Sequence, residues 1–274
     1  MSASRHRLGR LIGNAVLLAA VATTLAPLLW MLVTSLRPKQ DVFDGALPSA
    51  LTFDNFSAVL HSVDIGRQLL NSVIFAGGVT LGQLAIGIPA AYAFSQSRGR
   101  WSRWAFAVLL LTMSVPFVVV YLPNYILLSE VGLLDSHAGM ILPQVASAYG
   151  IFLLRQHFQA FPRAIVEAAR IDGASEWMVL WRVVVPASRS AISALAIFVF
   201  ISTWNEYVWP QLVAGAPGMQ TLSVGVAAFA SEEAGTQWGS IMAAATIACL
   251  PTVAAFLALR RQIFNVLLEG AVKG

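Results

Sequence analysis

Six long apolar runs constrain the fold of this 274-residue chain more than any other feature. A helix needs about 20 apolar residues to cross the hydrocarbon core of a bilayer. Within hydrocarbon, only helices and closed barrels satisfy every backbone N–H and C=O group. The sequence therefore predicts an all-α, polytopic membrane protein with six transmembrane helices. The six predicted spans are Leu11–Leu36, Leu69–Ser95, Trp101–Leu128, His137–Leu154, Ala187–Val213 and Gly239–Leu259.

The composition agrees with a location in a membrane. Charged residues make up 11% of the chain, whereas a soluble globular protein is about a quarter charged. Several runs contain Pro, which transmembrane helices tolerate because neighbouring helices satisfy the freed backbone groups. The first run follows Arg5, Arg7 and Arg10 and resembles a signal peptide, but it is too long and has no clear small-residue cleavage site. We therefore expect a retained membrane anchor.

The basic residues lie almost entirely on one side of the six predicted spans. Of the 17 Lys and Arg residues, only Arg37, Lys39 and Arg67 fall in loops on the opposite side. Because loops rich in Lys and Arg stay in the cytoplasm, both termini and the segment around Glu167 are expected there. The expected location is a bacterial plasma membrane, which the chain crosses several times. The isoelectric point near 9.6 then reflects topology, and no nucleic-acid partner is expected.

The chain shows no internal repeat and no soluble domain, so residues 1–274 are predicted to form a single transmembrane domain. Two long loops are predicted to be external, at about 37–68 and 214–238, and a polar cytoplasmic segment is expected at about 158–186. Gly78 and Gly82 form a Gly-x-x-x-Gly step, which is typical of close helix packing.

The sequence lacks the residues that several kinds of chemistry require. The lone Cys249 lies in an apolar run, so thiols form neither a disulfide framework nor a metal cluster. The four His residues are dispersed, and no metal site is expected. No Gly-x-x-x-x-Gly-Lys-Ser/Thr string is present, so the chain is not expected to bind ATP itself. A nucleophile–base pair within the spans is also missing, and no enzymatic activity is expected.

The polar segment between the fourth and fifth runs has a distinctive spacing. Three residues separate a Glu-Ala-Ala triplet from a Gly. Nine further residues separate that Gly from an aliphatic residue, which is followed by any residue, a second aliphatic residue and Pro. The residues that form this pattern are Glu167, Ala168, Ala169, Gly173, Val183, Val185 and Pro186, and Asp172 and Ala174 flank the glycine. An ordinary connector is the simpler alternative, but residue frequencies make five fixed residues at this spacing rare.

The same segment is predicted to form a helix-turn-helix. Pro suits the first turn of a helix, so a helix opens at Phe161-Pro162. Gly supplies the freedom for a turn, so Asp172-Gly173 ends that helix. A second short helix is expected from Ala174 to Arg182, with Pro186 ending it. Three alanines, 168, 169 and 174, would form a small-residue face for a partner's groove, and Glu167 would accept a hydrogen bond from a basic residue of that partner.

These residues resemble the EAA loop of ABC importer permeases, and further stretches resemble the maltose-type carbohydrate importers, specifically their second, smaller permease. The resemblance covers nearly the whole chain. The stretches that carry it are Thr52–Phe56, Asn71-Ser72, Gly150–Gln156, Trp204–Tyr207 with Pro210, Thr221-Leu222 with Gly225, Trp238 with Met242–Ala244, and Gly270–Gly274.

The resemblance implies a set of partners. It implies that the chain forms half of a heterodimeric pore with a second, unlike permease subunit. Two ATPase subunits would bind ATP and Mg and dock on the Glu167 segment, and an extracytoplasmic solute-binding protein would deliver a sugar-like substrate. The external loop at about 214–238 would face that binding protein, with Gln220, Glu232 and Glu233 as contact candidates.

Candidates for the substrate path follow from polar and aromatic residues in the spans. Glu206 is the one acidic residue placed inside a predicted span, and intramembrane charge is costly enough to indicate function. Trp204, Asn205, Tyr121 and Asn124 are further candidates, although aromatic residues also gather at membrane interfaces for packing reasons.

Two rival classes remain open at this point. A secondary solute transporter would show repeated halves and several midplane ionisable groups, and a membrane-embedded enzyme would need a catalytic constellation. The substrate is equally open, because disaccharides, amino sugars, glycerol phosphodiesters and other polyols use similar permeases.

Overall fold

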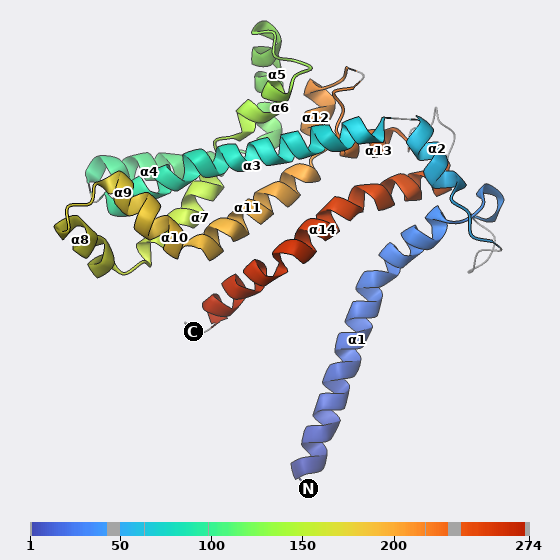
Figure 1. Ribbon diagram of the computed structural model, residues 1–274, viewed down its shortest axis with the longest axis horizontal. Helices are drawn as coiled ribbons and strands as arrows, with labels where there is room; N and C mark the ends of the chain where they lie inside the picture. Colours follow the sequence, from blue (N-terminus) through green and yellow to red (C-terminus); the bar gives the residue numbers. More distant parts are fainter. Residues whose placement is uncertain are drawn as a thin grey trace. The chain divides into compact units, whose positions relative to one another are not determined.

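The computed structural model describes residues 2–42, 50–62, 64–97, 99–216, 218–229 and 237–271, and these ranges contain helices and no strand. This confirms the predicted all-α fold class. The chain divides into two compact units, one of residues 1–65 and 225–251 and the other of residues 66–224 and 252–274. Figure 1 shows the helices coloured along the chain.

The first unit is built around the N-terminal helix. It contains α1 (Ser2–Ser35), the 3-10 helix η1 (Lys39–Asp41), α2 (Asp54–Ser62) and the beginning of α14 (Trp238–Ala271). The side chains of α1 are exposed from Ile12 to Leu29 although the run is strongly apolar. A helix of this kind suits a hydrocarbon environment, and Pro27 lies within it without breaking it.

Asn55 fastens the corner between α1 and α2. Its side-chain amide nitrogen donates to the carbonyl oxygens of Ser35 at 3.0 Å and Arg37 at 2.7 Å, which satisfies two groups left free at the end of α1. A Cβ on Gly239, at the start of α14, would lie 2.6 Å from the Asn55 amide atoms. Glycine is therefore required where α14 passes this corner.

The second unit holds the remaining helices. Three elements, α3 (Ile65–Gln96), α13 (Leu222–Ala228) and α14, have residues in both units. The others in this unit are α4 (Arg100–Thr112), η2 (Phe117–Val120), α5 (Tyr121–Glu130), α6 (His137–Ile141), η3 (Leu142–Gln144), α7 (Ala148–Gln159), α8 (Arg163–Ile171), α9 (Glu176–Val179), η4 (Leu180–Val184), α10 (Val185–Ala187), α11 (Arg189–Trp204) and α12 (Val208–Val213).

Three spans that the sequence predicts as continuous are interrupted. The run Trp101–Leu128 bends by 90° between α4 and η2, where Pro116 removes a backbone donor and biases its neighbour away from the helical conformation. The run His137–Leu154 bends by 48° between η3 and α7. The run Ala187–Val213 stops at Trp204 and resumes at Val208 in α12, whose first turn contains Pro210. Figure 1 shows the sharp turn between α4 and α5.

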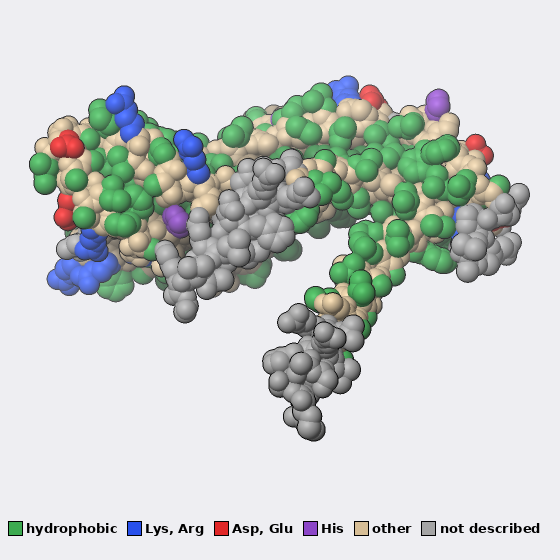
Figure 2. Space-filling model, turned by 60° about the horizontal axis from the view of Figure 1, so that its bottom comes forward, with side chains coloured by type: hydrophobic (Ala, Val, Ile, Leu, Met, Phe, Trp, Pro, Cys, Tyr) green, Lys and Arg blue, Asp and Glu red, His purple; other side chains and the backbone are tan. Residues whose placement is uncertain are grey.

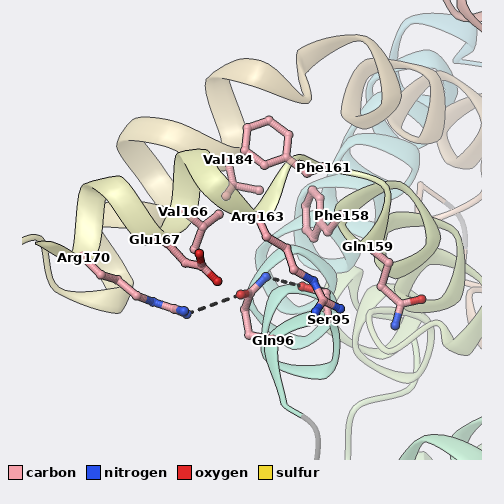
Figure 3. Close-up of a pocket in the computed structure, with 10 residues that line it drawn as sticks. All are labelled: Ser95, Gln96, Phe158, Gln159, Phe161, Arg163, Val166, Glu167, Arg170 and Val184. Atoms are coloured by element: carbon pink, nitrogen blue, oxygen red, sulfur yellow. Dashed lines mark hydrogen bonds between the residues drawn. The ribbon is translucent and has the colours of Figure 1, made fainter.

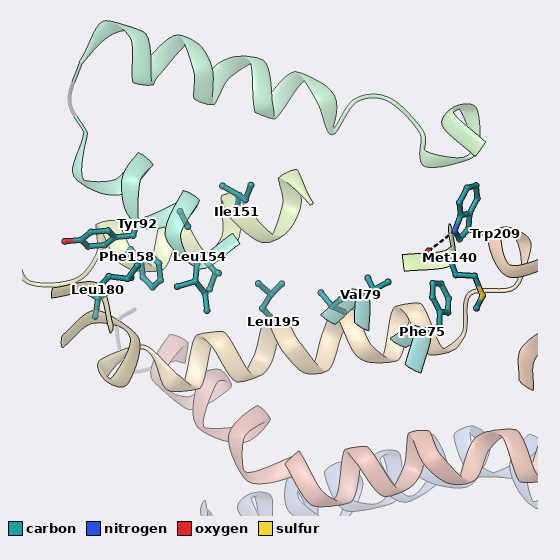
Figure 4. Packing of buried hydrophobic residues seen from close by; sticks show 14 of the residues in the cluster. Phe75, Val79, Tyr92, Met140, Ile151, Leu154, Phe158, Leu180, Leu195 and Trp209 are labelled. Atoms are coloured by element: carbon teal, nitrogen blue, oxygen red, sulfur yellow. Dashed lines mark hydrogen bonds between the residues drawn. The ribbon is translucent and has the colours of Figure 1, made fainter. Parts of the chain in front are cut away.

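The core of the second unit lies where α3, α7 and α11 pack together. Phe75 and Val79 of α3, Leu154 of α7 and Leu195 of α11 are almost fully buried in one cluster (Figure 4). Trp209 of α12 is fully buried at the same cluster, and its indole N–H donates to the Met140 carbonyl at 3.0 Å. The buried indole is therefore paired, as a polar group in such a core must be.

The Gly-x-x-x-Gly step on α3 is a packing feature, as predicted. A Cβ on Gly78 would approach the Ile141 side chain to 2.5 Å, and one on Gly82 would approach Cγ1 of Val145 to 2.5 Å. The two glycines thus let α3 lie against the end of α6 and the segment that joins it to α7.

Length and composition give a range for the number of spans. By length and composition, two helices in the described residues, α1 and α3, can cross a membrane, and counting each bent pair as one span raises the number to five. Within α14, residues Trp238–Ala254 form an apolar stretch that is shorter than these spans. The count of six stays a prediction. Hydrophobic side chains dominate the face shown in Figure 2, and charged side chains are sparse on it.

The close approach at Gly82 leads to a stability prediction. Gly82→Ala places a methyl group against Val145, whose β-branched side chain has little rotamer freedom. We expect the free energy of unfolding to fall by about 1 to 3 kcal/mol. Gly77→Ala is the matched control, since it lies on the same helix with nothing within 4 Å of its Cβ. The stability of both variants is measured as an apparent Tm in detergent. Equal Tm values for the two would contradict the packing role of Gly82.

Candidate functional site

A helix-turn-helix segment, residues 163–187, lies between α7 and α11, where the Glu167 pattern predicts one. Its first helix, α8, ends in a Schellman motif: the Ala174 N–H donates to the Ala169 carbonyl and the Gly173 N–H to the Arg170 carbonyl, both at 3.0 Å. Gly173 has a φ of +84°, which side-chain-bearing residues rarely adopt. The predicted break at Asp172-Gly173 is confirmed, and it depends on this glycine.

The second half of the segment differs from the prediction. Ser175 caps α9 by accepting the Met178 N–H at 3.3 Å. The chain then passes through a π-helical turn, η4, and continues as α10 to Ala187, so Pro186 does not end the helix. A proline ring ordinarily clashes with the carbonyl four residues before it, and the wider π turn relieves that clash.

The segment is fastened to α3 by a polar cluster. The Arg170 guanidinium donates to both carboxylate oxygens of Glu176, at 2.7 and 3.0 Å, and the Tyr92 hydroxyl donates to Glu176 at 2.7 Å. The Nη2 atom of Arg170, which makes the longer of these two bonds to Glu176, also donates to the Gln96 side-chain oxygen at 3.3 Å (Figure 3). These hydrogen bonds, Arg170 first and Tyr92 second, hold the pKa of the Glu176 carboxyl below its usual range. Glu176 therefore stays ionised and keeps both bonds at neutral pH.

Apolar residues complete the attachment of the segment. Val166 of α8, Val179 of α9, and Leu180 and Val184 of η4 are buried against the core of the second unit. Ile171, by contrast, is 86% exposed at the turn, and Trp177 is 62% exposed. The segment therefore presents an apolar outer surface as well as an anchored inner one.

Glu167 lines an open pocket under α8. The pocket has a volume of about 280 Å³, and Arg163, Gln159 and Gln96 also line it (Figure 3). Glu167 itself is exposed, so its carboxylate is accessible to a partner.

The predicted small-residue face is only partly exposed. Ala168 is exposed, whereas Ala169 and Ala174 are half-buried and pack against the core of their own unit. The reason is the Schellman motif, which turns these two residues inward beside each other. The three alanines therefore do not form one open face.

Glu206 lies at a helix break rather than within a continuous span. Its Oε1 accepts the Tyr121 hydroxyl at 2.9 Å and the Trp209 N–H at 3.3 Å. The second bond satisfies a free donor in the first turn of α12. The carboxyl group thus ties α5, α11 and α12 together, and it also lines a cavity beside α11.

The other substrate-path candidates are placed differently. Trp204 is buried, and its ring stacks with that of Phe200 at 5.8 Å between centroids. Asn205 donates to the Ile201 carbonyl at 2.7 Å, within its own helix. Asn124 lies on α5 and is half-buried. Their part in a substrate path stays a prediction.

The structure also brings together polar residues that the sequence reasoning missed. Two neighbouring cavities share Gln83 of α3, Gln144 of η3, and Ser147 and Tyr149 at the start of α7. Both glutamines lie inside predicted apolar spans, and a polar side chain at such a position is a signal of function. We call these two cavities the polar recess.

The binding-protein contact candidates are only partly described. Gln220 is half-buried, and its carbonyl accepts the Asn71 side-chain N–H at 3.0 Å. Glu232 and Glu233 lie outside the described residues. Within the described part of the chain, no group of three His, Cys, Asp or Glu residues is arranged to hold a metal ion.

Comparison with known proteins reveals full-length relatives. The chain is 32% identical to the lactose transport system permease protein LacG of Rhizobium radiobacter over 274 residues, which is 100% of both chains. It is 33% identical to the sn-glycerol-3-phosphate transport system permease protein UgpE of Yersinia pestis, over 93% of this chain and 94% of the relative.

A solved structure agrees in fold. A chain in the crystal structure of a bacterial ABC transporter involved in the import of the acidic polysaccharide alginate superposes with a TM-score of 0.81 at 25% identity, covering 91% of this chain and 95% of that one. The profile of one family matches residues 83–264, which include the polar recess and the helix-turn-helix segment. The chain therefore belongs to the family of binding-protein-dependent transport system inner membrane components.

Proposed function

We propose that this chain is a permease subunit of an ATP-driven bacterial importer for a sugar-like solute. The observation that carries the proposal is the helix-turn-helix segment, which holds Glu167 in the open next to a glycine-dependent turn. The family is a transport family, and its members LacG and UgpE are transport permeases for lactose and sn-glycerol 3-phosphate.

The segment at 163–187 is the docking element for the ATPase in this proposal. Its exposed apolar residues, Ile171 and Trp177, and the accessible Glu167 carboxylate offer a partner both apolar contact and an acceptor for a basic side chain. The distribution of Lys and Arg favours the cytoplasm for this segment and for both termini. Two ATPase subunits bind ATP and Mg, since this chain has no P-loop.

The pore requires a second, unlike permease subunit. A single chain with at most six spans has too little inner surface to enclose a path for a sugar. Glu206, Tyr121, Asn124, Trp204 and Asn205 are the proposed path residues from the sequence, and of these Glu206 and Tyr121 are joined by a hydrogen bond.

The solute-binding protein docks on the external side. The loop at about 214–238 faces it, and Gln220, Glu232 and Glu233 are the proposed contacts. Arg67 and Asn71 of α3 both donate to the Gly218 carbonyl, at 2.7 and 2.9 Å, and so hold the start of this loop in place. A fixed loop suits a surface that must receive another protein.

Charge reversal at Glu167 tests the docking element. Glu167→Lys places a cation where a partner's basic side chain is expected, and we expect ATPase co-purification and ATP-dependent uptake to fall by about tenfold or more. Gly173→Pro should do the same, because it abolishes the φ of +84° that the turn requires. Glu130→Lys is the control, since it makes the same change of charge on an exposed residue of α5. Unchanged co-purification and uptake in both segment variants would reject the docking role.

Crosslinking tests the orientation and the external contact. With Cys249 replaced by Ser, a cysteine at position 220 should crosslink to the solute-binding protein in intact cells, whereas one at Ile171 should crosslink to the ATPase in inverted vesicles. Immunoblots of the two adducts give the readout. The reverse pattern would place the termini on the other side, and uptake without ATP would favour a secondary transporter.

A further inference from the structure

The polar recess combines features of a solute-binding wall. Gln83, Gln144, Ser147 and Tyr149 line both of its cavities, and Glu206 and Ser202 of the α11 end line one of them. The larger cavity is about 610 Å³ and the smaller about 330 Å³. Sites for small molecules have cavities of ~300–1,000 Å³, so each is large enough to hold part of a saccharide.

Two of these polar groups have hydrogen-bonding capacity that the described chain does not use. The side-chain nitrogen of Gln144 is buried and has no partner within the described structure. Glu206 makes its two hydrogen bonds through Oε1, which leaves its second oxygen as an acceptor at the recess. A buried donor without a partner is unusual in proteins, and a ligand is one of the explanations for it.

The recess also has an aromatic wall. Tyr149 is 40% exposed and Phe198 is 53% exposed, and their rings lie 5.4 Å apart between centroids. Aromatic faces provide apolar contact, while the amide and hydroxyl groups beside them provide directional hydrogen bonds. A polyhydroxylated molecule presents both kinds of surface, since its C–H faces are apolar and its edges carry hydroxyl groups.

The charge of the recess favours neutral solutes over anionic ones. No Lys, Arg or His is among the described residues that line the two cavities, whereas phosphates and carboxylates are usually held by such cations. The α7 N-terminus opens on the recess, but the Ser147 hydroxyl already accepts the Gly150 N–H there. The Glu206 carboxylate would repel an anion directly.

Resting on the proposed importer function, we propose that the polar recess binds a neutral polyhydroxylated solute during transport and disfavours an anionic one. Gln144 donates to a solute hydroxyl, Glu206 accepts from another, and the Tyr149–Phe198 pair contacts an apolar face of the solute. This chain would then share its solute class with a lactose permease rather than with relatives that transport glycerol phosphate or an acidic polysaccharide.

The test uses the complete transporter, with its partner permease, ATPase and binding protein, reconstituted in vesicles that contain ATP. Labelled neutral mono- and disaccharides and polyols are compared with glycerol 3-phosphate and uronate oligomers. We expect ATP-dependent uptake of a neutral member and no uptake of the acidic ones. Uptake of acidic members alone, or of no neutral member, overturns the proposal. If the ATPase also fails to co-purify and nothing is taken up with ATP, the importer function itself is rejected.

Variants of recess residues then test whether the polar recess binds the solute. Gln144→Leu should lower uptake of the neutral solute by roughly tenfold, because the site loses a donor to a solute hydroxyl. Gln211→Leu, the same change on an exposed residue outside the recess, should retain uptake. Tyr149→Leu is a second variant, at a ring that is 40% exposed. Co-purification of the partner chains reports assembly of each variant. Full uptake by both assembled recess variants would overturn the assignment.

Discussion

Backbone hydrogen bonding inside hydrocarbon is the constraint on which the rest of this structure depends. A helix break in a membrane frees N–H and C=O groups where little water is available, so it persists only where side chains take the place of the missing backbone partners. At the break after Trp204, Glu206 accepts the Trp209 N–H and the Ser223 hydroxyl donates to the Trp204 carbonyl at 2.9 Å. The acidic residue that looks out of place in an apolar run is therefore the group that makes the break possible.

The helix break before α7 is stabilised in the same way, and the side chains that stabilise it also line the proposed solute site. The Ser147 hydroxyl accepts the Gly150 N–H, and the Gln83 side chain donates to the Gln144 carbonyl at 2.9 Å. The Gln144 side-chain nitrogen takes part in neither bond and has no partner among the described residues. The side chains that stabilise this break also line the polar recess. An interrupted helix therefore provides polar surface within the membrane, where a continuous helix would present apolar side chains.

Sequence reasoning succeeded where the physical signal is local. Hydropathy located the apolar runs, and Gly173 marked the turn because a positive φ is a property of one residue. It failed where the outcome depends on packing between distant segments. Pro27 lies within α1 without breaking it, whereas Pro116 lies at a 90° bend. The residue type alone does not distinguish these two outcomes. The π turn before Pro186 is likewise invisible in the pattern, since it is a local adjustment to a helix held by its neighbours.

The contacts of α3 connect the two parts of the site. At one end Tyr92 and Gln96 bond to the helix-turn-helix segment through Glu176 and Arg170. In the middle of the same helix, Gln83 lines the polar recess. Because α3 is a continuous helix of 32 residues, a displacement of the segment reaches the recess wall through covalent structure rather than through a chain of side-chain contacts. The geometry thus supplies a direct mechanical route between the element proposed to dock an ATPase and the surface proposed to bind the solute.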